Sequence, residues 1–287
     1  MKRTLLALLA CLGLVVGVAA VASADPRHDH GDPRDRAVGY YLALGDSLAA
    51  GYQPGLGDDK TGGYVGGTYA AIRADQPRTQ LVNLACSGET VVTLVAGGMC
   101  DFSRGSQLAQ AVSFLRAHGR TTRTITLDIG ANDVQPCVNR TTLVIDTVCI
   151  QAGLGHIAAT LPTVVKKLRT LAPHATIVVL NYYNPFLAAW LLGPTGQVVA
   201  EQSTALQAQL NTVIATAVGT RARVADVATS FRSTDQTPVS VPGLGTLPTN
   251  VATICTLTWM CGKLDIHAND QGYALMAHTV VARLGRR

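Results

Sequence analysis

The 287-residue sequence lacks the patterns of three common functional classes. It has no cluster or stripe of Lys and Arg, and its formal net charge is only +5, which argues against a nucleic-acid-binding surface. Its glycine-rich stretch at 51–67 is not followed by Gly-Lys-Ser or Gly-Lys-Thr, so it is no phosphate-binding loop. No two cysteines have the Cys-x-x-Cys spacing that zinc sites favour. We therefore expect no nucleic-acid partner, no metal and no cofactor.

The N-terminus has the layout of a secretory signal peptide. Two basic residues precede an apolar stretch at 5–22, and Ala22-Ser23-Ala24 offers small residues for cleavage. A membrane anchor is the alternative, because the apolar stretch is nearly long enough to cross a bilayer. The adjoining cleavage pattern favours a signal peptide over 1–24, followed by a flexible polar tail at 25–37. Cleavage would remove two basic residues and no acid, leaving 21 against 18, a net charge of +3.

Cysteine usage agrees with export. One of the seven cysteines lies in the predicted signal, and six remain in the mature chain. An even number in an exported protein indicates disulfides, and six cysteines allow fifteen pairings. Proximity in the sequence favours three of these pairs: Cys86 with Cys100, Cys137 with Cys149, and Cys255 with Cys261.

An apolar run at 40–44 ends in Gly45-Asp46-Ser47. A short, bounded apolar run is typical of a buried strand, and Gly45 supplies the backbone freedom of a tight strand exit. Ser47 would then lie at the carboxyl end of that strand, where open α/β sheets bind their ligands. An ordinary turn is the alternative, since all three residue types are common in turns.

Strand and helix patterns alternate along the rest of the chain. We expect further strands at 79–85, 123–129, 175–181 and 222–227, and helices at 65–74, 107–117, 154–171, 197–217 and near 273–284. This order predicts an α/β fold with a parallel sheet of about five strands, covered by helices on both faces. No repeat or charge run interrupts it, so 38–287 is predicted to be a single domain. Residues 229–258, rich in Ser, Thr, Pro and Gly, are predicted to form a long loop over the site.

Three further groups with chemical potential follow strands or precede the last helix. Gly88 follows the second strand with a backbone N–H that a ligand could reach, although a simple turn explains it equally well. Asn132 follows the third strand and carries a carboxamide N–H that can donate to an oxyanion. His267 is the histidine best placed to take the proton of Ser47, because the others lie in helices or at the opposite end of the sheet. Asp128, inside a strand, is interpreted as a structural acid that holds neighbouring loops.

The connection after the fourth strand, Pro185 to Leu192, is strongly apolar. Such a stretch either packs as core or faces an apolar ligand. We interpret Phe186, Leu187 and Trp190 as a wall that binds an acyl chain.

Taken together, these stretches resemble the SGNH hydrolases, also called GDSL lipases and esterases. Gly45-Asp46-Ser47-Leu48 reproduces the Gly-Asp-Ser-Leu block of that family, and Gly130-Ala131-Asn132-Asp133 matches its Gly-x-Asn-Asp block. Gly88 and His267 stand in the places of the family's oxyanion glycine and catalytic base. The predicted disulfides are similar to those of the secreted actinobacterial branch.

The resemblance implies a flavodoxin-like three-layer α/β/α sandwich and a role for each matched residue. Ser47 would be the nucleophile and His267 the base, with Ser47, Gly88 and Asn132 as the oxyanion donors. In the family's last block an Asp stands three residues before the His, whereas here Asp265 stands two before it. Either Asp265 orients the imidazole as the third member of a triad, or a backbone carbonyl near 264–265 does so in a Ser–His dyad. We expect the triad, because an acidic residue is present.

The expected function is that of a secreted serine esterase or lipase that hydrolyses carboxylic esters of lipid or acyl type. We expect a monomer that makes transient contact with a lipid surface. A carbohydrate acetyl esterase is the alternative enzyme, since the resemblance also permits acetylated sugars. A catalytically silent surface-binding protein is the alternative from another class.

Overall fold

The structure, a computed structural model, describes residues 38–139 and 141–285. A five-stranded sheet in the order β2-β1-β3-β4-β5 forms its centre, and all neighbouring strands in it are parallel. The strands are β1 Tyr40–Gly45, β2 Gln80–Asn83, β3 Thr122–Asp128, β4 Thr176–Leu180 and β5 Arg223–Ala225. The predicted α/β fold is thus confirmed, in the flavodoxin-like strand order. The signal peptide and tail predicted for 1–37 lie outside the described residues.

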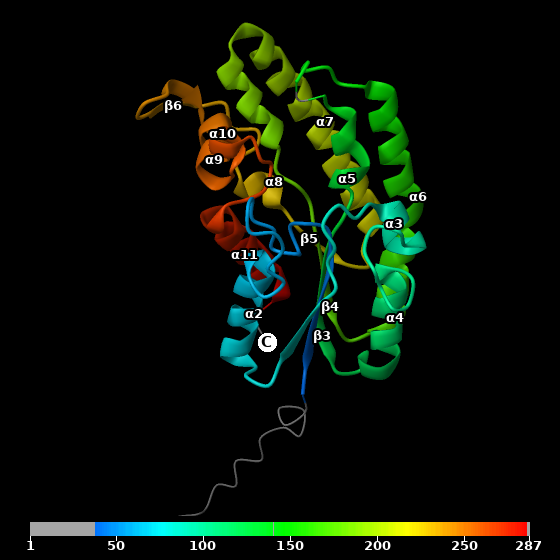
Figure 1. The fold of residues 1–287 in the computed structure, drawn as a ribbon. Helices are drawn as coiled ribbons and strands as arrows, with labels where there is room; N and C mark the ends of the chain where they lie inside the picture. The colour runs from blue at the N-terminus through cyan, green and yellow to red at the C-terminus, as the bar shows by residue number, and fades with distance from the viewer. Residues whose placement is uncertain (1–37, 140, 286–287) are drawn as a thin grey trace, which may run out of the picture.

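Helices cover both faces of this sheet (Figure 1). One layer contains α2 and α11, which pack against each other, and the opposite layer contains α3, α4, α6 and α7. Their bounds are α2 Gly63–Asp75, α3 Val91–Ala96, α4 Gln107–His118, α6 Thr147–Leu171, α7 Pro194–Val218 and α11 Asp270–Leu284. Because both faces are covered, the central strand β1 is apolar without alternation.

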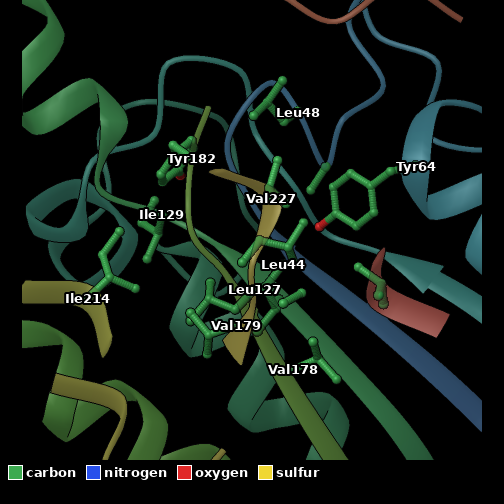
Figure 2. Close-up of a cluster of buried hydrophobic side chains, with 14 of the residues drawn as sticks. Leu44, Leu48, Tyr64, Leu127, Ile129, Val178, Val179, Tyr182, Ile214 and Val227 are labelled. Carbon is green, nitrogen blue, oxygen red and sulfur yellow. The ribbon is translucent and has the colours of Figure 1, made fainter. Parts of the chain in front are cut away.

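The core lies between the sheet and the two helical layers. Leu44 is in register with Leu127, which is in register with Val179, and all three side chains are buried. Ile214 of α7 and Tyr64 of α2 approach these strands from opposite sides (Figure 2). Burial of such side chains stabilises the sheet by roughly 1.5–3 kcal/mol each.

Two helices begin earlier than their apolar spacing indicates. The carboxylate of Asp146 accepts the N–H of Cys149 at 3.0 Å and starts α6 at Thr147 rather than at 154. Pro194 starts α7, because the fixed φ of proline suits a first helical turn. These added turns extend both helices towards the carboxyl end of the sheet.

By length and composition alone, α6 is also a candidate membrane span. Its side chains Ile157, Leu161, Val165 and Leu168 are completely buried. The apolar spacing of α6 therefore serves the core, as predicted for a covering helix.

The prediction of a long loop at 229–258 is wrong. This stretch contains the end of α8 Val227–Ser230, the hairpin of β6 Pro238–Val241 and β7 Gly245–Pro248, and all of α9 Thr249–Leu257. The short helix α10 Met260–Lys263 follows it. In α9 the hydroxyls of Thr253 and Thr256 donate to carbonyls four residues earlier, at 2.8 and 2.9 Å. The Ser and Thr residues of 229–258 indicated a loop, because their side chains more often compete with the backbone hydrogen bonds of a helix.

Candidate active site

Ser47 lies just after β1 on a turn that Gly45 makes possible. Gly45 has a φ of +137°, and a Cβ at this position would lie 2.3 Å from the carbonyl oxygen of Asp128. Its N–H donates to Oε1 of Gln107 at 2.7 Å, and Nε2 of Gln107 donates to its carbonyl at 3.0 Å. The N–H of Tyr52 donates to the carbonyl of Ser47 at 3.0 Å. Backbone and side-chain bonds thus fix the serine at the carboxyl edge of the sheet.

His267 lies in the connection between α10 and α11. Its carbonyl accepts the N–H of Trp259 at 3.0 Å, and the hydroxyl of Tyr183 donates to the carbonyl of Ile266 at 2.7 Å. The ring of Tyr52 packs against the imidazole with centroids 4.4 Å apart. The histidine loop is therefore fastened both to β4's exit and to the turn that carries Ser47.

The structure brings Ser47, His267 and Asp265 into one hydrogen-bonded row. Nε2 of His267 lies 2.8 Å from Oγ of Ser47, and Nδ1 lies 2.7 Å from Oδ1 of Asp265. The same carboxylate oxygen also accepts the backbone N–H of His267 at 3.0 Å. Leu264, with a left-handed φ of 54°, forms the tight turn that brings the carboxylate of Asp265 to the imidazole. An acid two residues before the histidine can therefore reach the imidazole.

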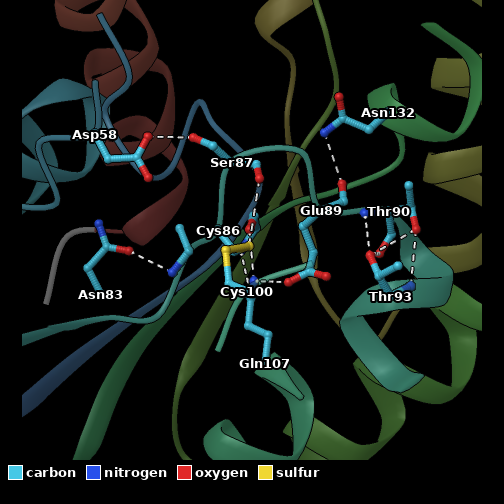
Figure 3. Close-up of a disulfide and its surroundings, with 12 residues drawn as sticks. Asp58, Asn83, Cys86, Ser87, Glu89, Thr90, Thr93, Cys100, Gln107 and Asn132 are labelled. Atoms are coloured by element: carbon cyan, nitrogen blue, oxygen red, sulfur yellow. Dashed lines mark hydrogen bonds between the residues drawn. A yellow bond between two sulfur atoms is a disulfide. The ribbon is translucent and has the colours of Figure 1, made fainter. Parts of the chain in front are cut away.

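Asn132 stands at the start of the short helix α5 Ala131–Val134, beside the loop that carries Gly88. Its Nδ2 donates to the carbonyl of Glu89 at 2.9 Å (Figure 3), which leaves the second amide hydrogen for another acceptor. Gly88 has a φ of +85°. Among the described residues, neither the N–H of Ser47 nor that of Gly88 has a hydrogen-bond acceptor in the protein. These N–H groups, with the second amide hydrogen of Asn132, thus have no acceptor in the described part of the chain.

The three disulfides that sequence proximity favoured are present, Cys86–Cys100, Cys137–Cys149 and Cys255–Cys261. The first lies beside Ser87, whose hydroxyl donates to Asp58 at 2.5 Å, and beside Glu89 (Figure 3). Each disulfide closes a loop next to Gly88, Asn132 or His267. In the chain-entropy model a closed loop of about fifteen residues contributes about 3 kcal/mol.

Two buried acids, Asp46 and Asp128, contact the turn that carries Ser47. Asp46 accepts the N–H of Leu48 at 3.0 Å and the hydroxyl of Tyr182 at 2.7 Å. Asp128 accepts the hydroxyl of Tyr64 at 2.5 Å. Burial raises the pKa of Asp128 well above its usual range, and the adjacent charge of Asp46 raises it further. Its contacts with the hydroxyl of Tyr64 and the N–H of Ala49 are those of a structural acid that holds neighbouring loops.

The raised pKa of Asp133 predicts how the stability of the fold changes with pH. Burial raises the pKa of its carboxyl from 3.8 to about 6, against the hydrogen bond from the N–H of Val91. The folded chain binds this proton more tightly than the unfolded chain, so stability is lost as pH rises from 3.8 to about 6. The neutral Asp133→Asn variant should avoid that loss and gain about 1–2 kcal/mol at pH 8, after allowance for solvent screening. Urea unfolding at pH 8 should show this gain and at pH 4 almost none; an equal difference at both pH values contradicts it.

A cavity opens beside Ser47, Asn132 and His267. Most of its lining is apolar and comes from α5, α6, α7 and the 3-10 segment η2 Pro185–Leu192. Of the predicted acyl wall, Phe186 lines the cavity. Leu187 is instead buried in the core and Trp190 packs against it, so neither lines the cavity. Leu154, Leu206 and Leu210 take their place, and periodicity alone could not separate such lining residues from core residues.

Three solved structures share this fold at low sequence identity. A lipase from a goat rumen metagenome is 18% identical with a TM-score of 0.56, over 85% of this chain and 97% of that one. An α/β hydrolase from the metagenome of Lake Arreo, Spain, is 19% identical with a TM-score of 0.53, over 86% and 95%. An acetylxylan esterase from Geobacillus stearothermophilus is 16% identical with a TM-score of 0.50, over 87% and 97%. No curated protein matches the sequence.

A serine, a histidine and a carboxylate in hydrogen-bond contact at the carboxyl edge of a parallel α/β sheet have the geometry of a serine hydrolase. The chain belongs to the GDSL-like lipase/acylhydrolase family, whose profile matches residues 43–275. That match begins within β1, before Ser47, and ends within α11, after His267.

Proposed function

We propose that this protein is a secreted serine esterase or lipase that hydrolyses carboxylic esters with an apolar acyl group. One observation carries the proposal: the hydrogen-bonded row from Asp265 through His267 to Ser47 ends beside a cavity with a mostly apolar lining. The three disulfides support export, because such bonds persist in oxidising compartments.

The proposed reaction is acyl transfer to water. Nε2 of His267 takes the proton of Ser47 as Oγ attacks the ester carbonyl, and Asp265 stabilises the imidazolium that forms. His267 then gives this proton to the leaving alcohol, and the acyl group remains on Ser47. In the second half, His267 takes a proton from water, which attacks the acyl carbonyl and releases the acid with Ser47 restored.

The oxyanion of both steps would be stabilised by the N–H groups of Ser47, Gly88 and Asn132. Asn132→Ala removes one donor and should lower kcat by about two to three orders of magnitude, with a smaller change in KM. Steady-state kinetics on a short-chain ester measures this. An Asn132→Ala variant with the parent's kcat would exclude the amide from the oxyanion hole, provided that its circular dichroism shows an intact fold.

The acyl preference is tested with p-nitrophenyl esters from acetate to palmitate. Each methylene buried in the cavity is worth about 0.8 kcal/mol, so kcat/KM should rise from acetate towards medium acyl lengths. A maximum at acetate, together with release of acetate from acetylated xylan, would favour the carbohydrate esterase instead. Absence of turnover on every ester, with no fluorophosphonate label on Ser47, would favour a silent binding protein.

A further inference from the structure

One segment of the chain supplies a whole wall of the cavity. Between residues 134 and 154 the lining side chains are Val134, Gln135, Val138, Ile145, Ile150 and Leu154. Two of these, Val138 and Ile145, belong to the stretch that the Cys137–Cys149 disulfide closes, here termed the 137–149 loop. We propose that the 137–149 loop determines which acyl chain lengths the cavity accepts, an inference that rests on the proposed function.

The local structure of this loop turns its neighbouring side chains to opposite sides. Val138 and Ile145 form an isolated antiparallel bridge, and the N–H of Asn139 donates to the carbonyl of Val144 at 2.9 Å. Ile145 is part-buried against the core and lines the cavity. Val144, the next residue, is 60% exposed and does not line it. The loop therefore presents one apolar side chain to the cavity and one to solvent.

The loop is attached to the rest of the domain by few bonds. Within the described part of the chain, all hydrogen bonds of residues 138–146 join partners between 135 and 150. Its place over the cavity thus depends on its two ends, on the disulfide and on the packing of Val138 and Ile145. A disulfide whose loop carries cavity-lining residues holds a wall in place as well as stabilising the fold.

Acyl length separates this role from the chemistry. An acetyl group reaches only the surroundings of Ser47 and His267, whereas a long chain must lie along the apolar wall. Each methylene that loses its contact lowers kcat/KM by about fourfold. Changes in the lining residues of the 137–149 loop should therefore alter the hydrolysis of longer esters more than that of acetate.

The test compares Ile145→Phe with Val144→Phe on p-nitrophenyl acetate, octanoate and palmitate. Ile145→Phe fills part of the cavity and should lower the palmitate-to-acetate ratio of kcat/KM by about tenfold or more, the equivalent of about two methylenes. Val144→Phe adds the same ring on the solvent side of the loop and should keep the parent's ratio. Val144→Phe should also retain the parent's kcat on acetate.

The disulfide is tested by the double variant Cys137→Ser/Cys149→Ser. It should lose most of the octanoate-to-acetate preference in kcat/KM, because the disulfide no longer holds the wall of the cavity. If Ile145→Phe loses acetate hydrolysis as well, this double variant decides the question. Unchanged length ratios in either deciding variant, with acetate hydrolysis intact, would overturn the role of the loop and leave the proposed function standing. Absence of Ser47-dependent hydrolysis in the parent would instead refute the proposed function.

Discussion

Replacement of Ser47 by alanine should lower kcat on a carboxylic ester by about six orders of magnitude. The hydroxyl is the atom that becomes acylated, and Oγ of Ser47 lies 2.8 Å from the imidazole that activates it. Without it, His267 has no nucleophile to deprotonate, and only weak catalysis by the oxyanion donors and the cavity remains. The measurement is turnover of p-nitrophenyl acetate, together with labelling by a fluorophosphonate.

Ser203 gives the matched control, because it lines the same cavity. Its hydroxyl donates to the carbonyl of Ala200 at 2.8 Å and accepts from Asn184 at 2.8 Å, so no imidazole activates it. Ser203→Ala should therefore keep the fluorophosphonate label, and Ser47→Ala should lose it. A labelled and active Ser47→Ala protein would refute the mechanism, whatever the state of the rest of the site.

The parts of the site that could be predicted from the sequence are those that local pattern places. Ser47 and Asn132 each follow a buried apolar run directly, and the carboxyl ends of parallel strands meet at one edge of a sheet. His267 required elimination among several histidines, and the order of strands and helices made that elimination feasible. The parallel sheet follows from the alternation of strands and helices, whereas its flavodoxin-like arrangement was implied only by the resemblance to the SGNH hydrolases.

The remaining features depend on contacts between distant segments. Asp265 reaches the imidazole because Leu264 adopts a left-handed backbone conformation. No sequence pattern predicted this conformation, which is uncommon for a residue other than glycine. The pairing of the buried acids Asp46 and Asp128 requires β3 to meet the end of β1, and Asp46 also accepts the hydroxyl of Tyr182. Trp190 was predicted to line the acyl site because an apolar residue looks the same whether it faces a ligand or the core.

Asp265→Asn should lower kcat by about four orders of magnitude at neutral pH. One carboxylate oxygen accepts both the backbone N–H and Nδ1–H of His267, at 3.0 and 2.7 Å, which leaves Nε2 free to take the proton of Ser47. An asparagine can present its NH₂ group to Nδ1 instead, which moves the ring proton to Nε2 and removes the base. Steady-state kinetics on p-nitrophenyl acetate measures the loss.

Asp270 is the matched acid for this experiment, because it lies three residues beyond the histidine and its carboxylate accepts from Gln53 at 3.1 Å rather than from the imidazole. Asp270→Asn should keep kcat within about tenfold of the parent's, as expected for a surface acid. If Asp265→Asn does so too, a backbone carbonyl orients His267 and the centre is a dyad.

Residues that act as one unit are strongly non-additive, so the Ser47→Ala/Asp265→Asn double variant should be no slower than Ser47→Ala alone. Once the nucleophile is absent, the tautomer of His267 has no proton transfer left to control. A further loss in the double variant would mean that Asp265 supports the residual reaction by a route that does not pass through the serine.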